Sequence, residues 1–366
     1  MPAMMKAAAY LEPNRIEIVA KPIPDVGPTD ALMRITTTTI CGTDVHILSG
    51  EYPVARGLTV GHEPVGTIEK LGNAVSGYHE GQRVIAGAIC PNFNTYPAMD
   101  GVPSQDGTYL IASGLCGCHG YKATAGWRFG NMIDGTQAEY VLVPDAQANL
   151  APIPDGLTDE QVLMCPDIMS TGFAGAENAN IRIGDFVVIF AQGPIGLCAT
   201  AGARLKGAST IVAVDGNDER LAVAQDLGAD VTLNFRTCDV VDEVMRLTGG
   251  RGADSAIEAL GTQLTFEQGL RVLKPGGTLS SLGVYSSDLI IPLGAFAAGL
   301  GDHKINTALC PGGKERMRRL MSVLASGRLD LARLVTHERT LDDIVAAYEL
   351  FAGQQDGVLK IAIKPS

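Results

Sequence analysis

The chain of 366 residues is longer than one ordinary hydrophobic core supports, so its length favours two domains. Its 28 basic and 40 acidic residues give a net charge of −12, which argues against nucleic acid or an anionic membrane as a partner. The eight cysteines are dispersed, the amino terminus lacks an apolar signal segment, and no run approaches the roughly 18 apolar residues of a membrane span. We therefore expect a cytoplasmic protein with reduced thiols.

The first third of the chain is predicted to be rich in β-strands. Pro and Gly separate short β-prone runs at residues 16–19, 31–37, 66–69 and 83–86. A long excursion rich in Gly, Ser, Pro and Asn follows at residues 91–119.

From about residue 185 onward, strands and helices are predicted to alternate. The strand candidates are residues 186–190, 210–214, 231–235, 255–260 and 278–284. The helix candidates between them are residues 197–206, 219–227, 240–247 and 266–273. Repeated β–α units imply a doubly wound parallel sheet with helices on both faces. The tail, residues 310–366, holds two helix candidates and a β-like run, and we expect it to rejoin the first domain.

Two short motifs bring together side chains that bind metals. Residues 41–46 read Cys-Gly-Thr-Asp-Val-His, and residues 61–63 read Gly-His-Glu. Zinc accepts Cys sulfur, His nitrogen and carboxylate oxygen together, and a site with three protein ligands keeps a position open for substrate. Isolated residues of these types would more often be a buried small hydrophobe and a core histidine. Their combination with a nucleotide-binding signature makes redox chemistry on a metal-bound oxygen the leading hypothesis.

That signature follows the strand candidate at residues 186–190. Ala191, Gly193 and Gly196 occupy the three small positions of a G-x-G-x-x-G turn that opens a helix, where a pyrophosphate can approach the backbone. Asp215 ends the next strand, about 20 residues later, where an acid accepts the ribose hydroxyls and repels a 2′-phosphate. NAD is therefore favoured over NADP, although Asp215 could instead be a turn residue or a helix cap.

Together these motifs resemble the zinc-dependent medium-chain alcohol dehydrogenases, most closely the bacterial secondary alcohol (isopropanol) dehydrogenases. The likeness covers nearly the whole chain and includes residues 126–130, 166–172 and 309–313. It implies an α/β fold with a GroES-like, β-rich catalytic domain and a Rossmann cofactor domain. The implied ranges are residues 1–170 for the catalytic domain, 171–306 for the NAD-binding domain, and 307–366 for the C-terminal part of the catalytic domain. The resemblance also suggests a homotetramer.

By resemblance, Cys41, His62 and Asp167 are the ligands of one catalytic zinc per subunit, and Glu63 is an exchangeable fourth ligand. Cys165 is a rival third ligand because it lies two residues from Asp167.

Three further residues resemble the groups that act around the metal. Asp44 is expected to hydrogen-bond the outer nitrogen of His62, as second carboxylates around metal sites commonly do, or else to be a turn acid. Thr43 and His46 stand in the positions of a proton relay that passes through the cofactor ribose.

The remaining site residues are also implied by resemblance. A small apolar substrate pocket would be lined by Ala88, Ile89, Trp127, Leu309 and Cys310, although without the resemblance a tryptophan is more often a core residue. The residues expected to bind the cofactor, with the last as a pyrophosphate contact, are Thr171, Gly193, Pro194, Ile195, Gly196, Asp215, Arg220, Gly261, Leu282, Gly283, Val284 and Lys360. Many family members hold a structural zinc on four closely spaced cysteines. The spacing of Cys90, Cys116, Cys118 and His119 differs from that pattern, so free thiols are preferred here.

The predicted activity is reversible hydride transfer between NAD and small secondary, or some primary, alcohols and their ketones or aldehydes. A zinc dehydrogenase specific for polyols or aldehydes is an alternative, and it would need more polar pocket residues. A non-enzymatic nucleotide-binding protein is the other alternative. Three converging metal ligands argue against it, because such a protein has no use for them.

Overall fold

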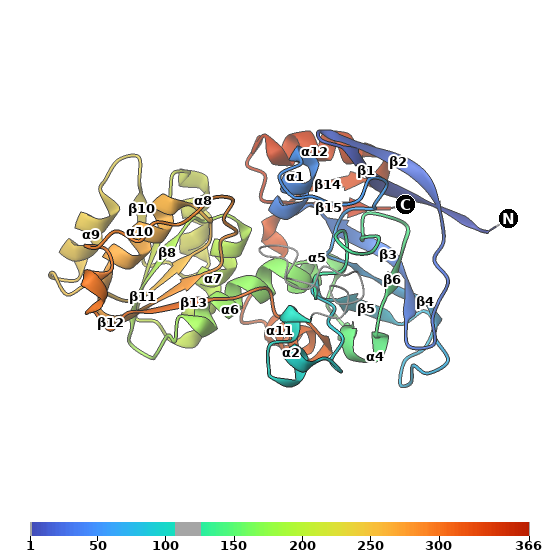
Figure 1. Ribbon diagram of the computed structural model, residues 1–366, viewed down its shortest axis with the longest axis horizontal. Coiled ribbons are helices and arrows are strands. Elements are labelled where there is room, and N and C mark those ends of the chain that lie inside the picture. The colour runs from blue at the N-terminus through green and yellow to red at the C-terminus, as the bar shows by residue number, and fades with distance from the viewer. Residues whose placement is uncertain (1, 107–125, 366) are drawn as a thin grey trace. The chain divides into compact units, whose positions relative to one another are not determined.

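The computed structural model describes residues 2–106 and 126–365, which form two compact units (Figure 1). One unit comprises Met1–Ser170 and Cys310–Ser366, and the other comprises Thr171–Leu309. The tail thus returns to the unit that contains the first third of the chain. Among the described residues, no helix is long and apolar enough to cross a membrane.

The first unit is built on strands. A hairpin of β1 (Met4–Glu12) and β2 (Arg15–Pro22) accompanies a seven-stranded sheet in the order β14–β15–β3–β4–β5–β7, with β6 paired to β3. The strands of this sheet are β3 (Ala31–Thr39), β4 (Val65–Leu71), β5 (Arg83–Ala86), β6 (Tyr140–Val143), β7 (Leu150–Pro152), β14 (Val335–Thr340) and β15 (Lys360–Lys364). Inward-facing apolar side chains, among them Met33, Ile68 and Val141, form its core. The four predicted runs lie in β2, β3, β4 and β5.

Short helices connect these strands. The segments before the unit boundary are α1 (Gly42–Ser49), α2 (Tyr96–Met99), η1 (Pro103–Gln105), α4 (Ala146–Asn149), α5 (Asp159–Val162) and η3 (Cys165–Met169). Those after it are α11 (Lys314–Ala325), η5 (Ala332–Leu334), η6 (Leu341–Asp343) and α12 (Ile344–Ala352). The segment η3 is a π-helical turn, in which the amide of Met169 donates to the carbonyl of Met164 at 2.8 Å. Such turns insert one extra residue and are frequent at functional sites.

The second unit contains a six-stranded parallel sheet in the order β10–β9–β8–β11–β12–β13. Its strands are β8 (Phe186–Phe190), β9 (Thr210–Asp215), β10 (Val231–Asn234), β11 (Ala253–Glu258), β12 (Leu273–Ser281) and β13 (Lys304–Thr307). The helices of this unit are α6 (Ser170–Asn178), which begins at the boundary, α7 (Pro194–Lys206), α8 (Asp218–Asp226), α9 (Val240–Leu247), α10 (Gln263–Arg271) and η4 (Ala297–Gly299). Each predicted strand and helix overlaps one of these elements. The edge strand β13 was not predicted.

The strand order reverses between β8 and β11. The chain steps from β8 to β9 and β10 in one direction, and from β11 to β12 and β13 in the other. Right-handed crossovers therefore place α7 and α8 on one face of the sheet and α9 and α10 on the other (Figure 1). In doubly wound sheets, ligands bind at the carboxyl ends of the strands where this reversal occurs.

Candidate functional site

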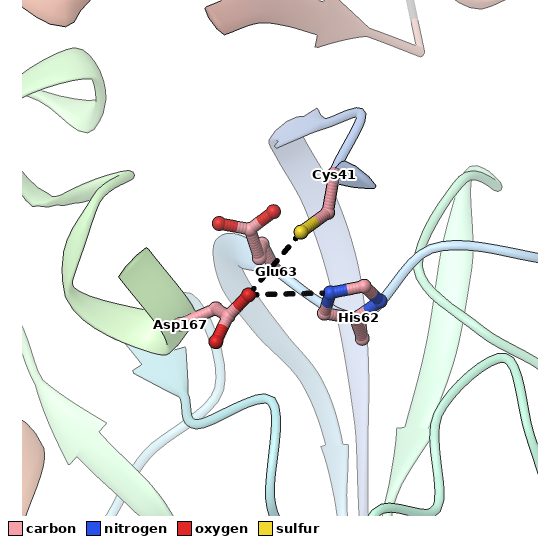
Figure 2. Close-up of side chains that lie close together, drawn as sticks. All are labelled: Cys41, His62, Glu63 and Asp167. Atoms are coloured by element: carbon pink, nitrogen blue, oxygen red, sulfur yellow. Dashed lines mark hydrogen bonds and ion pairs between the residues drawn. The ribbon is translucent and has the colours of Figure 1, made fainter. Parts of the chain in front are cut away.

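Four side chains from three separate segments of the first unit meet in one buried cluster (Figure 2). Cys41 immediately precedes α1, His62 and Glu63 precede β4, and Asp167 lies in the π-helical turn η3. One potential ligand atom from each lies within 4.8 Å of the others. The Sγ of Cys41 is 3.4 Å from Oδ2 of Asp167, and Nε2 of His62 is 3.5 Å from the same oxygen.

These distances fit the ligands of an ion with tetrahedral coordination. With the usual zinc bond lengths for sulfur, nitrogen and oxygen, two ligand atoms of a tetrahedral site should lie roughly 3.4–3.6 Å apart. The cluster also carries a buried carboxylate oxygen, Oε1 of Glu63, that has no hydrogen-bond partner among the described residues. Because a buried charge needs a partner, the chemistry and the geometry of this cluster both suit a divalent cation.

Charge around the cluster is partly balanced by Lys360 of β15. Its Nζ lies 2.6 Å from Oε2 of Glu63 and donates to the carbonyl of Ile40 at 3.2 Å, and the residue is 1% exposed. Burial raises the pKa of Glu63 and of the Cys41 thiol, and in both cases Lys360 opposes the shift. The resemblance predicts a pyrophosphate contact for Lys360, and that contact stays a prediction; in the structure its ammonium group pairs with Glu63.

Asp44 lies in the first turn of α1 and contacts two of the potential metal-binding residues, Cys41 and His62. Its Oδ2 accepts a hydrogen bond from the amide of Cys41 at 2.8 Å, and its Oδ1 is 3.4 Å from Nδ1 of His62. Burial disfavours a charged His62, but the carboxylates of Asp44 and Asp167 outweigh it and raise the pKa of the imidazole. Both roles considered for Asp44, helix-turn acid and histidine partner, are compatible with these contacts.

The π-helical turn separates the two candidates for the third ligand. Asp167 joins the cluster, whereas Sγ of Cys165 is buried 3.8 Å from Sδ of Met169. The carbonyl of Pro166 accepts from the amide of Ala88 at 2.8 Å, which fixes the turn against the segment after β5. The structure therefore brings Asp167 to the cluster and leaves Cys165 outside it.

In the second unit, the turn between β8 and α7 has the geometry of a phosphate-binding loop. Gly193 caps the start of α7, and a Cβ added to it would meet open space. A Cβ at Gly196 would lie 1.8 Å from the carbonyl oxygen of Ala191, so only glycine fits there. Pro194 and Ile195 are the first residues of the helix. A half-buried helix amino terminus of this kind, with open space beside Gly193, can take a pyrophosphate.

Ala191 has φ +69°, a left-handed conformation that favours glycine. The chain thus keeps the backbone shape of the first glycine position with an alanine in it.

Asp215 ties this turn to the next strand. Its Oδ2 accepts from the amide of Gln192 at 2.6 Å, and its Oδ1 accepts from the amide of Asn217 at 2.9 Å. The cap of α8 is Asn217, whose side chain accepts from the amides of Glu219 and Arg220. Asp215 therefore ends β9 beside the glycine turn, and a neighbouring residue performs the capping.

Buried Glu258, at the carboxyl end of β11, was not predicted as a site residue. Its Oε1 accepts from the amides of Leu260 and Gly261 at 2.8 and 2.7 Å, and its Oε2 accepts from the hydroxyl of Tyr285 at 2.7 Å. A Cβ on Gly283 would lie 2.1 Å from the amide nitrogen of Gly261, so the segments after β11 and β12 touch.

The predicted cofactor residues Gly261, Leu282, Gly283 and Val284 therefore share one edge of the sheet. Thr171 is buried at the start of α6.

Known families match both units. The family described as "Alcohol dehydrogenase GroES-like domain" matches residues 27–155, and "Zinc-binding dehydrogenase" matches residues 194–326. A protein of Cupriavidus necator called "Alcohol dehydrogenase" is 83% identical over 100% of both chains. The chain belongs to the zinc-type alcohol dehydrogenase family.

More distant relatives of this dehydrogenase agree. An "NADP-dependent isopropanol dehydrogenase" of Thermoanaerobacter brockii is 34% identical over 97% of this chain and 98% of its own. The solved structure of alcohol dehydrogenase TADH from Thermus sp. ATN1 superposes with a TM-score of 0.85 at 30% identity, covering 98% of this chain and 99% of that one. The expected resemblance and the GroES-like and Rossmann fold are thus confirmed. The enzyme is an alcohol dehydrogenase with a nucleotide cofactor.

An aromatic wall lies beside the cluster of potential metal ligands in the dehydrogenase. The ring of Trp127 is 5.8 Å from the ring of His62 and 4.8 Å from that of Tyr52, edge-on in both cases. Its indole nitrogen donates to the carbonyl of Phe129 at 2.8 Å, which fixes the ring. Tyr52 was not predicted, because one aromatic residue in a Gly- and Pro-rich segment gives no signal of its partner.

Two of the other predicted pocket residues, Ala88 and Cys310, contact the π-helical turn. Ala88 and Ile89 are buried in the segment after β5. The Sγ of buried Cys310 lies 3.7 Å from the carbonyl oxygen of Asp167. Leu309 is assigned to the second unit.

The predicted relay residues lie on α1, and Thr43 and His46 are nearly one turn apart. The Sγ of Cys41 is 3.9 Å from the hydroxyl of half-buried Thr43. Exposed His46 contacts Oε2 of Glu51 through Nδ1 at 2.6 Å. The hydrogen bond from His46 lowers the pKa of Glu51, so this carboxylate is charged over a wider pH range than usual. Glu51, like Glu258 and Tyr52, is a residue that the sequence motifs do not reveal.

The possible second metal site can be described only at one residue. Cys90 is buried, its Sγ lies 3.3 Å from the carbonyl of Gly87, and burial raises its pKa to about 12. Cys116, Cys118 and His119 lie outside the described residues.

Proposed function

We propose that the enzyme interconverts small secondary alcohols and ketones, and some primary alcohols and aldehydes, with NAD, at one zinc ion held by Cys41, His62 and Asp167. The observation that carries this proposal is the buried cluster with the spacing of a tetrahedral site. Bound zinc supplies a Lewis acid for the substrate oxygen, and the nicotinamide supplies or accepts the hydride.

Glu63 serves as the exchangeable fourth ligand, and Lys360 holds its carboxylate when it is not on the metal. The support is the 2.6 Å ion pair between two fully buried groups. The anionic side chains of Cys41, Asp167 and Glu63, one lysine and a divalent cation sum to zero charge. The neighbouring carboxylate of Asp44 is stabilised by the hydrogen bonds it accepts. This balance matters because an uncompensated charge in this buried place would be costly.

Thr43 and His46 carry the proton between substrate and water. The Thr43 hydroxyl lies 3.9 Å from the Sγ of Cys41, so it would stand beside a zinc ion held there and could pass on a proton. His46 is exposed, so its ring can exchange a proton with solvent, and Glu51 fixes the ring orientation.

The buried, mostly apolar surroundings support a small substrate with alkyl substituents. Trp127, Ala88 and Ile89 are all at least nine-tenths buried next to segments that carry the ligands. The extra hydroxyls of a polyol would lose their water here, at a cost of roughly 1–3 kcal/mol for each one left unpaired.

The preference for NAD rests on Asp215. Its carboxylate ends β9 next to the glycine turn, where it can accept the ribose hydroxyls and repel a 2′-phosphate. The domain roles follow: residues 1–170 and 307–366 provide the metal and substrate groups, and residues 171–306 bind the cofactor.

We also propose a homotetramer. Ile290, Leu293 and Leu300 are 71%, 74% and 84% exposed in the segment that precedes the edge strand β13. A patch of exposed apolar side chains commonly marks a surface that another chain covers. A cytoplasmic location stays a prediction from the sequence. Light scattering behind size-exclusion chromatography should give four times the 38.3 kDa chain mass.

The substrate and cofactor are tested with purified enzyme of measured zinc content. Propan-2-ol, butan-2-ol, ethanol and a polyol are each assayed with NAD and with NADP. We expect the highest kcat/KM for the secondary alcohols with NAD. Turnover of the polyol alone would favour the polyol alternative. Protein that contains no zinc as purified and turns over none of the alcohols would contradict the proposal.

A further inference from the structure

We propose that Gln137 and Tyr348 are positioning residues for the metal site, and that they act on His62 and Cys41 through Asp44. This inference rests on the proposed zinc site. It concerns two buried polar residues that neither the motifs nor the proposed mechanism uses.

Gln137 lies between the two segments that carry Cys41 and His62. Its Nε2 donates to the carbonyl of Thr39 at 3.1 Å and to Oδ2 of Asp44 at 3.4 Å. The backbone amide of Gln137 donates to the carbonyl of Val60 at 3.0 Å, and a Cβ on Gly61 would lie 2.6 Å from the Cγ of Gln137. Gln137 therefore packs directly against the residue that precedes His62.

The orientation of the Gln137 amide is fixed by its neighbours. The carbonyl of Thr39 and the carboxylate of Asp44 can only accept, so the NH₂ group must face them. The amide oxygen then faces the hydroxyl of Tyr348, on α12, at 3.0 Å, and that hydroxyl must donate. Burial raises the pKa of Tyr348 well above its ordinary value, which keeps the donor proton in place.

This series of hydrogen bonds sets the direction of Asp44. Its Oδ2 is held by Gln137 and by the amide of Cys41, so Oδ1 is left to face Nδ1 of His62. A proton on Nδ1 then leaves the lone pair on Nε2 for the metal. Tyr348 and Gln137 are 2% and 0% exposed, so bulk solvent does not compete for these contacts.

The test uses the full-length enzyme with Q137M, Y348F and the double variant. Met keeps the length of the side chain and removes the amide, and Phe removes only the hydroxyl. Y78F is the control, because half-buried Tyr78 also donates a hydrogen bond in this unit, to the carbonyl of Leu150 at 2.6 Å. The measurements are zinc affinity by competition with a chromophoric chelator, the visible spectrum of the cobalt-loaded protein, and melting temperatures with and without metal.

We expect Q137M to weaken zinc binding by about 10- to 100-fold, Y348F to weaken it less, and both to change the cobalt spectrum. Because the two residues act in series, the double variant should resemble Q137M. Y78F should lower the two melting temperatures equally and leave zinc affinity unchanged.

Three results would overturn the inference, and the third is distinguishable from the first two. If the unmodified enzyme binds zinc and Q137M and Y348F bind it equally well, Gln137 and Tyr348 only support the fold. Equal losses of melting temperature with and without metal would likewise show a purely structural role. If the unmodified enzyme itself binds no zinc, the proposed function fails and this inference fails with it.

Discussion

Replacing Asp215 by alanine tests whether this residue selects the cofactor or only supports the fold. The carboxylate has two structural partners, the amides of Gln192 and Asn217, at 2.6 and 2.9 Å. Gln192 is fully buried, so its amide would be left unpaired, which costs roughly 1–3 kcal/mol of stability. Asn217 is exposed, so water can replace the carboxylate as the acceptor for its amide. We therefore expect a folded variant with a lower melting temperature.

The effect on cofactor choice is separate from this loss. A hydrogen bond from ribose to a carboxylate contributes roughly 1.5–3 kcal/mol, and NAD would lose it. NADP would gain from removal of the repulsion between Asp215 and the 2′-phosphate, by about 1 kcal/mol or more. Since each 1.4 kcal/mol is about tenfold, the ratio of kcat/KM for NAD to that for NADP should fall roughly 100-fold.

The assay measures both cofactors with saturating propan-2-ol, next to the control D230A. Asp230 accepts from the amide of Ile211 at 2.8 Å, at the other end of the same strand, so its loss should destabilise the sheet without touching the cofactor turn. D215A should change the cofactor ratio, and D230A should not. A D215A enzyme that is less stable but keeps the original ratio would refute the selection role.

Three further predictions concern single positions. A191G removes the strain of a left-handed alanine, which is worth about 1–2 kcal/mol, but the unfolded state gains roughly 0.5–1 kcal/mol from the greater freedom of glycine. The free energy of unfolding in urea should therefore be unchanged or slightly higher. A clear loss of stability would contradict this. E258A removes the acceptor of two amides and of the Tyr285 hydroxyl, and it should lower the free energy of unfolding by about 3 kcal/mol or more. E258Q keeps an acceptor and should lower it less. Equal losses in the two variants would show that hydrogen bonding is not the cause. H46Q should lower kcat and alter its pH profile with full zinc content, and E51Q should do so more weakly; zinc loss in H46Q would instead make His46 structural.

The sequence predicts local features of this protein well. The alternation of apolar runs with helical segments identifies the parallel sheet, because strands buried on both faces are nearly continuous in Val, Ile and Ala. The small residues of the β8–α7 turn are visible because backbone contact with a phosphate tolerates few side chains. The left-handed conformation of Ala191 is not visible, since it depends on the path of the chain around it.

Long-range pairing sets the limit of such prediction. Spacing alone could not join Asp167 to Cys41, and only the family resemblance did so, because their contact depends on how the π-helical turn packs. Lys360 lies almost 300 residues after Glu63, and its apolar neighbours in sequence give no sign of its buried partner. Glu258 gave a weak signal, an acid at the end of a strand and three residues before Gly261, but its donors come both from the segment that follows it and from the end of β12 and beyond.

The account depends most on one zinc ion bound at the cluster. Zinc per chain should be measured by mass spectrometry after dialysis for the unmodified enzyme, C41A, D167A and C165A. We expect about one zinc in the unmodified enzyme and in C165A, and close to none in C41A and D167A. Full zinc content in C41A or D167A, or its loss in C165A alone, would contradict the ligand set on which the proposed reaction rests.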